Sequence, residues 1–129
     1  MRVKVNQEKN MDIFITPDIF KALLREHVFG QNEIEWVKDR PPVILDLMVK
    51  YPPLCLVKVK PEFVCEIHKD KPEYFVVQSY FENGMIGLSP KIDGSDRVYV
   101  RPECFELLEY CGDFTPAYIE ELISAPKTS

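Results

Sequence analysis

Hydrophobic residues follow two different periods along this chain. Before residue 52 they recur at helical spacing, and from Leu54 onward they alternate with polar residues, as in half-buried strands. The pair Pro52-Pro53 joins the two parts, and a chain of this size favours one shared core. We therefore expect a single α+β domain over residues 1–129, with a helical part at about 12–51, a β part at about 54–110 and a short C-terminal helix at about 115–125.

The first helix is predicted to follow a short strand at Met11–Ile15 and to end at Gly30. Thr16 is a good N-cap, Pro17 suits the first helical position, and glycine is a common helix stop. One face of this segment is apolar and consists of Ile19, Phe20, Leu23, Leu24 and Val28.

Two more helical segments are expected before the strands begin. Residues 32–38 fit one or two helical turns, with Trp36 packing inward. Residues 42–51 lie between proline pairs, and their apolar positions fit a helix. A strand is the alternative for this second segment, because its first residues, Val43–Leu45, are largely β-branched.

The β part is predicted from alternation and from β-forming residues. In the segment LCLVKVK, Cys55, Val57 and Val59 point one way and lysines point the other. Residues 62–68 (EFVCEIH) alternate in the same way. Further strands are expected at 74–81, which should be covered on both faces, at 85–88, at 97–101, and after a short helical turn within 102–110.

The dipeptide Asn83-Gly84 lies between two apolar runs and predicts a hairpin. Asn and Gly tolerate the positive φ of a tight type I′ turn. The longer loop at residues 90–96 (PKIDGSD) is expected to be less constrained and is therefore the better candidate for contact with a partner.

The order of parts between Leu54 and Tyr110 resembles that of the SH3-like small β-barrels, including Tudor-like and KOW-like modules. A strand of the type CLVKVK comes first, the hairpin FVVQSYFENGMIGL lies in the middle, and RVYVRPECFELLE closes the unit. The resemblance covers less than half of the chain and concerns strand order. It implies a strongly bent antiparallel barrel that binds peptides, nucleic acids or neighbouring subunits. The N-terminal helices have no counterpart in this resemblance, and we expect them to pack on the barrel.

The charge balance is acidic, with a formal net charge of −5 at pH 7. Nucleic-acid binders usually carry a basic surface, so this class is the alternative rather than the main hypothesis. Its candidate residues are Lys58, Lys60, Lys69 and Lys71. The first residues lack the apolar block of a signal peptide, and we expect a cytoplasmic protein.

The four cysteines, Cys55, Cys65, Cys104 and Cys111, form no C-x-x-C pair. Zinc-ribbon spacing is therefore absent. We expect buried thiols in a reducing compartment, with a disulfide or a metal site as the alternative.

Sequence motifs for catalysis are missing. The chain contains no phosphate-binding glycine loop, no G-x-S-x-G and no H-E-x-x-H. We expect no catalytic residue, no cofactor and no metal. An enzyme or metal protein without a recognisable motif is a third hypothesis.

The main hypothesis is a non-enzymatic protein-binding module, acting as a small regulatory or inhibitory subunit. One form of it is a phage-type inhibitor of a host complex. Tyrosine and arginine are enriched at binding hot spots, and Tyr99 lies between two arginines. Packing against a residue of the neighbouring strand is an equally good explanation of Tyr99. The candidate partner-binding residues are Tyr99, Arg97, Arg101, Asp93 and Tyr80.

Overall fold

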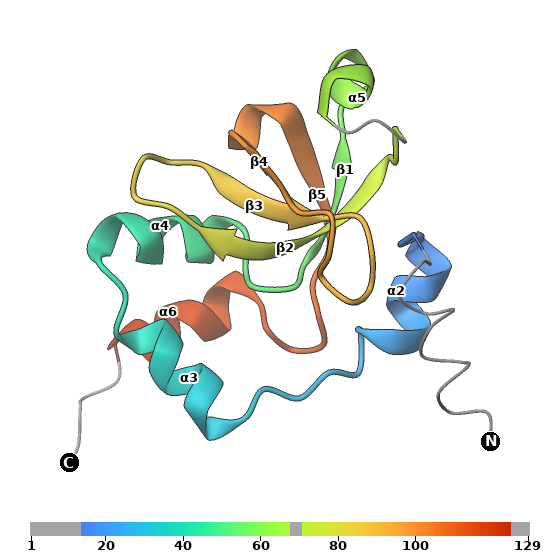
Figure 1. The fold of residues 1–129 in the computed structure, drawn as a ribbon. Helices are drawn as coiled ribbons and strands as arrows, with labels where there is room; N and C mark the ends of the chain where they lie inside the picture. Colours follow the sequence, from blue (N-terminus) through green and yellow to red (C-terminus); the bar gives the residue numbers. More distant parts are fainter. Residues whose placement is uncertain (1–13, 68–70, 125–129) are drawn as a thin grey trace.

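The computed structural model describes residues 14–67 and 71–124 (Figure 1). Its helices are α2 (Pro17–Leu23), α3 (Gln31–Lys38), α4 (Pro42–Lys50), α5 (Pro61–Ile67), the 3-10 helix η1 (Pro102–Cys104) and α6 (Pro116–Ser124). Its strands are β1 (Leu56–Val59), β2 (Tyr74–Tyr80), β3 (Ile86–Ser89), β4 (Val98–Val100) and β5 (Phe105–Glu109). No helix in the described ranges is both long enough and apolar enough to cross a membrane.

The strands form one antiparallel sheet in the order β4-β3-β2-β1-β5. This arrangement confirms the α+β class. The pairings among the described residues leave β4 and β5 at the two edges, so the sheet is open and the expected closed barrel is not formed.

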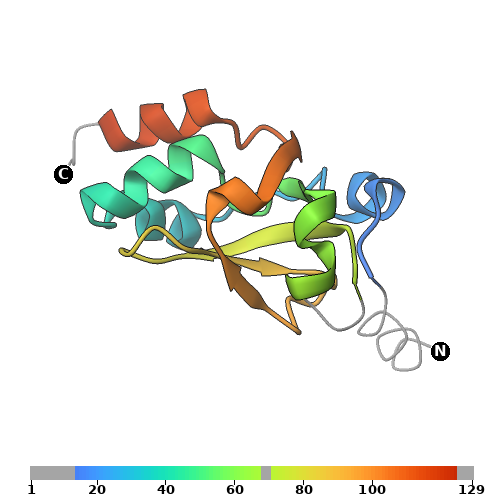
Figure 2. The same ribbon diagram turned by 90° about the horizontal axis from the view of Figure 1, so that it is seen from above.

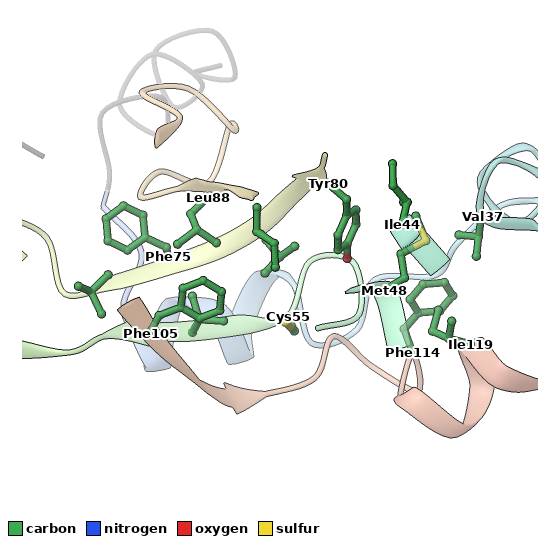
Figure 3. Packing of buried hydrophobic residues seen from close by; sticks show 14 residues of the cluster. Val37, Ile44, Met48, Cys55, Phe75, Tyr80, Leu88, Phe105, Phe114 and Ile119 are labelled. Carbon is green, nitrogen blue, oxygen red and sulfur yellow. The ribbon is translucent and has the colours of Figure 1, made fainter. Parts of the chain in front are cut away.

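One face of the sheet is buried against helices α3, α4 and α6, which lie together on that side (Figures 1 and 2). Val37 and Met48 from the helices belong to the same apolar cluster as Val57, Phe75 and Leu88 from the strands. Figure 3 shows side chains of this cluster between the helices and the sheet, among them Val37, Met48, Phe75 and Leu88. The two parts with different periods therefore share a core.

Tyr80 lies where the sheet meets the helices. Its side chain is only 7% exposed, and its hydroxyl donates a hydrogen bond of 2.6 Å to the carbonyl oxygen of Tyr51, directly after α4. Burial raises the pKa of the Tyr80 hydroxyl, so the hydroxyl keeps its proton for this bond. The bond fixes the end of β2 to the end of α4.

The opposite face of the sheet carries a second, smaller cluster. Phe20 of α2 and Ile15 pack there on Leu56, Val76 and Cys111. Leu56 and Val76 are directly paired in the β1–β2 ladder. Helix α2 therefore covers the β1–β2 region of this face. Strand β2 is buried on both faces around Val76, whereas its end and Phe81 are partly exposed on the outer face, so the expected coverage of residues 74–81 holds only in part.

Helix α2 starts as predicted but ends earlier. Thr16 Oγ1 accepts a hydrogen bond from the Ile19 amide, and Pro17 is the first helical residue. The helix was expected to continue to Gly30, yet it ends at Leu23, and Val28 is 84% exposed. After α2 the chain instead packs on the turn at residues 111–114, where the Leu24 carbonyl accepts a hydrogen bond from the Cys111 thiol and Phe29 stacks on Phe114. Most of the strand expected at Met11–Ile15 lies outside the described residues.

The next two helices match their predicted ranges, with one side chain differently placed. Helix α3 buries Val37, whereas Trp36, expected to point inward, is 39% exposed. The Arg40 guanidinium lies 4.3 Å from the centre of the Trp36 ring. Helix α4 is confirmed, with Ile44 and Met48 buried, and the strand alternative is wrong.

The alternating segment at residues 62–68 was expected to be a strand, but its described residues belong to helix α5, and residue 68 lies outside the described residues. Pro61 favours a helix start, and Glu62 suits the positive end of the helix dipole. Phe63 and Val64 both pack against the large core, and neighbouring residues of a strand would point to opposite faces. Tertiary packing and the proline therefore override the alternation.

The hairpin at Asn83-Gly84 is confirmed, but its turn type differs from the prediction. Of the two residues only Gly84 has positive φ (93°). The Gly84 amide donates to the Phe81 carbonyl, and the Phe81 amide donates to the Met85 carbonyl. This is a three-residue loop with a left-handed glycine, and not the type I′ turn.

The C-terminal helix is confirmed as α6. The Thr115 hydroxyl accepts a hydrogen bond from the Tyr118 amide, which repeats the Thr-Pro helix start of α2. Ile119 is fully buried, Tyr118 and Leu122 pack against the large core, and Ile123 is 37% exposed.

Cys55 should resist alkylation in the folded protein. It is fully buried as expected, and burial raises the pKa of its thiol, which lowers the thiolate fraction at any given pH. With iodoacetamide at pH 8, peptide mapping should show Cys55 unmodified in the native protein and modified in urea. Equal labelling in both states would contradict the buried placement.

Gly112→Ala should destabilise the fold more than Gly84→Ala. Both glycines have positive φ, which costs alanine about 1–2 kcal/mol. At Gly112 the added Cβ would also lie 2.9 Å from the Arg25 carbonyl oxygen, whereas at Gly84 the nearest atom is 3.6 Å away. Urea unfolding should show a loss of about 2–4 kcal/mol for Gly112→Ala. Equal losses in the two variants would show that the close contact is not made.

Candidate functional site

A β-bulge in β2 determines which aromatic side chains reach the surface. Val77 pairs with Leu88 but Ser79 pairs with Gly87, so β2 contains one extra residue, Gln78, relative to β3. The bulge reverses the alternation of side chains along the strand. Tyr80 therefore points into the core.

The register beyond the bulge places a glycine beneath neighbouring side chains on the outer face of the sheet. Ser79, Gly87 and Tyr99 lie side by side on β2, β3 and β4. Gly87 has no side chain, and a Cβ built there would clash with Ser79 Oγ and would lie 3.3 Å from both Arg97 Cδ and Tyr99 Cε1. The side chains of Arg97 and Tyr99 therefore lie across β3 over this glycine.

Phe81 and Tyr99 form an exposed aromatic pair beside this glycine. Their ring centres are 5.3 Å apart with an interplanar angle of 79°, an edge-to-face arrangement. Phe81 is 39% exposed and Tyr99 is 53% exposed. With Asn83 and Met85 they line a shallow depression of about 310 Å³. We call Phe81, Met85, Arg97, Tyr99 and Arg101 together the Tyr99 surface.

The two arginines border the aromatic pair along β4. Arg101 Nη1 donates a hydrogen bond of 3.3 Å to the Asn83 carbonyl oxygen, which places its side chain along the hairpin tip. Both arginines are exposed, and within the described part of the chain neither forms an ion pair. Among the described residues, both guanidinium groups are therefore available to a carboxylate of a partner.

The loop at residues 90–96 was expected to be loose but is held by several interactions. Lys91 Nζ and Asp96 Oδ2 form an ion pair of 3.0 Å. Asp93 Oδ1 accepts hydrogen bonds from the Ser95 amide and hydroxyl, and these bonds lower the pKa of the Asp93 carboxyl. Gly94 lies against the Gln78 side chain, so the loop borders the outer face of β2.

The structure brings together three of the five partner-binding candidates. Tyr99, Arg97 and Arg101 share the Tyr99 surface, whereas Asp93 uses its carboxylate within the neighbouring loop. Tyr80 does not reach the surface, because the bulge turns it into the core.

Sequence reasoning missed Phe81 and Met85 as members of this surface. The alternation set by Phe75 and Val77 would have placed Phe81 inside. No residue type in this stretch signals the bulge, so no simple pattern identifies Phe81 as exposed.

The lysines of the nucleic-acid alternative lie elsewhere. Lys58 is opposite Glu106 in the β1–β5 ladder and opposite Tyr74 in the β1–β2 ladder. Lys60 directly follows β1, which β2 and β3 separate from β4. Lys71 is exposed in the connection before β2, and Lys69 lies outside the described residues.

A second depression, of about 260 Å³, lies between the segment after α2 and the turn that precedes α6. Its lining includes His27, Asp113 and Cys111, which are residue types used in cysteine catalysis. The Cys111 thiol is fully buried and donates a hydrogen bond of 2.6 Å to the Leu24 carbonyl oxygen. Phe29 and Phe114 stack nearby with ring centres 3.8 Å apart. The Cys111 thiol therefore has a structural role, because it holds the segment after α2 against the turn that precedes α6.

Metal-ligating side chains do not gather in the described ranges. Within residues 14–67 and 71–124, no group of three or more His, Cys, Asp or Glu side chains is arranged to hold a metal ion. Cys55 and Cys104 are free thiols, the first buried and the second partly exposed.

Comparisons with protein-family models, curated proteins and solved structures gave no significant match. The function is therefore inferred from the arrangement of the chain's own residues.

Ser79→Ala should leave the fold at least as stable as the wild type. In the described structure the Ser79 hydroxyl is buried and has no hydrogen-bond partner, and such a group costs about 1–3 kcal/mol. Alanine removes it while keeping the strand, so urea unfolding should show a change between zero and about 1 kcal/mol of stabilisation. A loss greater than about 1 kcal/mol would indicate that the hydroxyl makes a stabilising bond.

Proposed function

We propose that this chain is a non-enzymatic protein-binding module, a small regulatory or inhibitory subunit that binds its partner protein through the Tyr99 surface. One observation carries the proposal: the exposed edge-to-face pair of Phe81 and Tyr99, bordered by arginines without an ion pair in the described structure. Tyrosine and arginine are the residues most enriched at binding hot spots.

Burial of the aromatic pair would give the surface its binding energy. Phe81, Met85 and Tyr99 expose apolar area around one depression. Removal of such area from water stabilises a complex by roughly 25 cal/mol per Å² before the costs of association. The arginines would add orientation and charge selectivity more than affinity.

Strand order supports an SH3-like classification of the β part as a second element of the proposal. β1 pairs with both β2 and β5, the β2–β3 hairpin lies in the middle, and η1 precedes the last strand. These parts follow the order on which the resemblance was based. Helix α5 and the open sheet are departures from it.

Protein is favoured over nucleic acid as the partner because of how the charges are distributed. The chain carries 21 acidic and 16 basic residues, and Lys58 lies beside Glu106 in the sheet. Single-strand binding proteins combine aromatic residues with a continuous positive groove. Two arginines on one strand provide less positive charge than such a groove requires.

Tyr99→Ala should lower partner recovery at least about tenfold, as expected for a hot-spot residue. The tagged protein would be purified from its native cells at moderate salt with nuclease present, and its partners quantified by mass spectrometry. The wild type should retain a stoichiometric protein partner.

The matched control is Leu108→Ala. Leu108 is 44% exposed and lies on β5, the opposite edge strand. This variant should retain the partner, and circular dichroism should show that both variants are folded. Unchanged recovery with Tyr99→Ala, or recovery that depends on nucleic acid, would refute the proposed interface.

A further inference from the structure

The Tyr99 surface has a regular spacing along the edge strand. Val98 and Val100 pack against the core, so Arg97, Tyr99 and Arg101 lie on the outer side. Residues on one side of a strand recur about every 7 Å. The surface therefore presents positive charge, an aromatic ring and positive charge along roughly 13 Å.

We propose that the partner presents an acidic segment in extended conformation, with one large apolar side chain between two carboxylates. An extended peptide has the same two-residue period as β4. Its apolar side chain would occupy the depression between Phe81, Met85 and Tyr99, and Asp or Glu two positions before and after it would reach Arg97 and Arg101. This inference rests on the proposed function and adds the chemistry of the partner.

Charge complementarity selects an acidic occupant over a basic or neutral one. The described structure gives neither arginine a carboxylate partner, whereas Arg25 and Lys91 are paired with Glu109 and Asp96. Guanidinium groups bind carboxylates with two parallel hydrogen bonds, which also fixes orientation.

The position of β4 suits an extended segment. β4 pairs with β3 on one side and is the edge of the sheet on the other, so its outer backbone groups have no strand beside them in the described structure. Because the Arg97 and Tyr99 side chains lean across β3, the segment would lie over the outer face of β3 and β4 and run along β4. The side chains of Arg97 and Tyr99 cover Gly87, so the apolar anchor would rest in the depression beside Phe81 and Met85.

Peptide titration followed by NMR tests this inference directly. The first probe is a short synthetic peptide with an aspartate two positions before and two positions after a phenylalanine. The second has the same composition, but its aspartates are adjacent to the phenylalanine. The third has lysines in place of the aspartates. A thymidine oligonucleotide is the fourth probe. The first peptide should bind about five- to tenfold more tightly than the other probes, with the largest shifts around Tyr99.

Reversal of the protein charges provides the second test. Arg97→Glu combined with Arg101→Glu should remove the preference for the aspartate peptide and create one for the lysine peptide. Lys50→Glu, an exposed change on α4, is the control and should bind like the wild type. Because the exchanged residues are exposed, the variant should keep the wild-type amide spectrum elsewhere.

Equal binding of the two aspartate peptides, tighter binding of the oligonucleotide, or no shifts with any peptide would overturn the inference. The proposed function is tested separately by partner recovery with Tyr99→Ala. If Tyr99→Ala loses its protein partner but the wild type shows no preference among the peptides, the Tyr99 surface is still the interface and the acidic motif is rejected.

Discussion

The structure depends on how the two faces of one sheet are covered. Helices α3, α4 and α6 cover the first face, with Phe75, Val77 and Leu88 buried at its centre. The second face is covered by α2 only near Leu56 and Val76. Apolar area that helices leave uncovered on a small protein commonly serves as an interaction site. The β3–β4 region of this face, with Phe81 and Tyr99, is such an area.

Two local features turn that uncovered region into a defined surface. The bulge at Gln78 reverses the alternation in β2, so that Tyr80 joins the core and Phe81 faces solvent. Gly87 then leaves space for Tyr99 to lie across β3 and meet Phe81 edge to face. The bulge thus places Tyr80 in the core and Phe81 in solvent, and the aromatic pair that results contributes contact area on the outside of the sheet.

Local chemistry explains which elements could be predicted from the sequence. Helix starts at Thr16 and Thr115 follow from capping, and the strand at Val57 follows from alternation, because both depend on neighbouring residues only. Helix α5, the early end of α2 and the exposure of Trp36 depend on packing between distant segments. The candidate site was predicted in part: Arg97, Tyr99 and Arg101 are on one surface because β4 is regular. The exposure of Phe81 was not predicted, because the pattern of residue types does not show that β2 contains an extra residue.

Site-specific photo-crosslinking tests most directly whether this surface is the interface. A photoreactive phenylalanine analogue would replace Tyr99 in one sample and Leu108 in another, and both would be irradiated in native cells. The account predicts a discrete protein adduct from position 99 and none from position 108. An adduct at position 108 alone, or equal adducts at both positions, would contradict it.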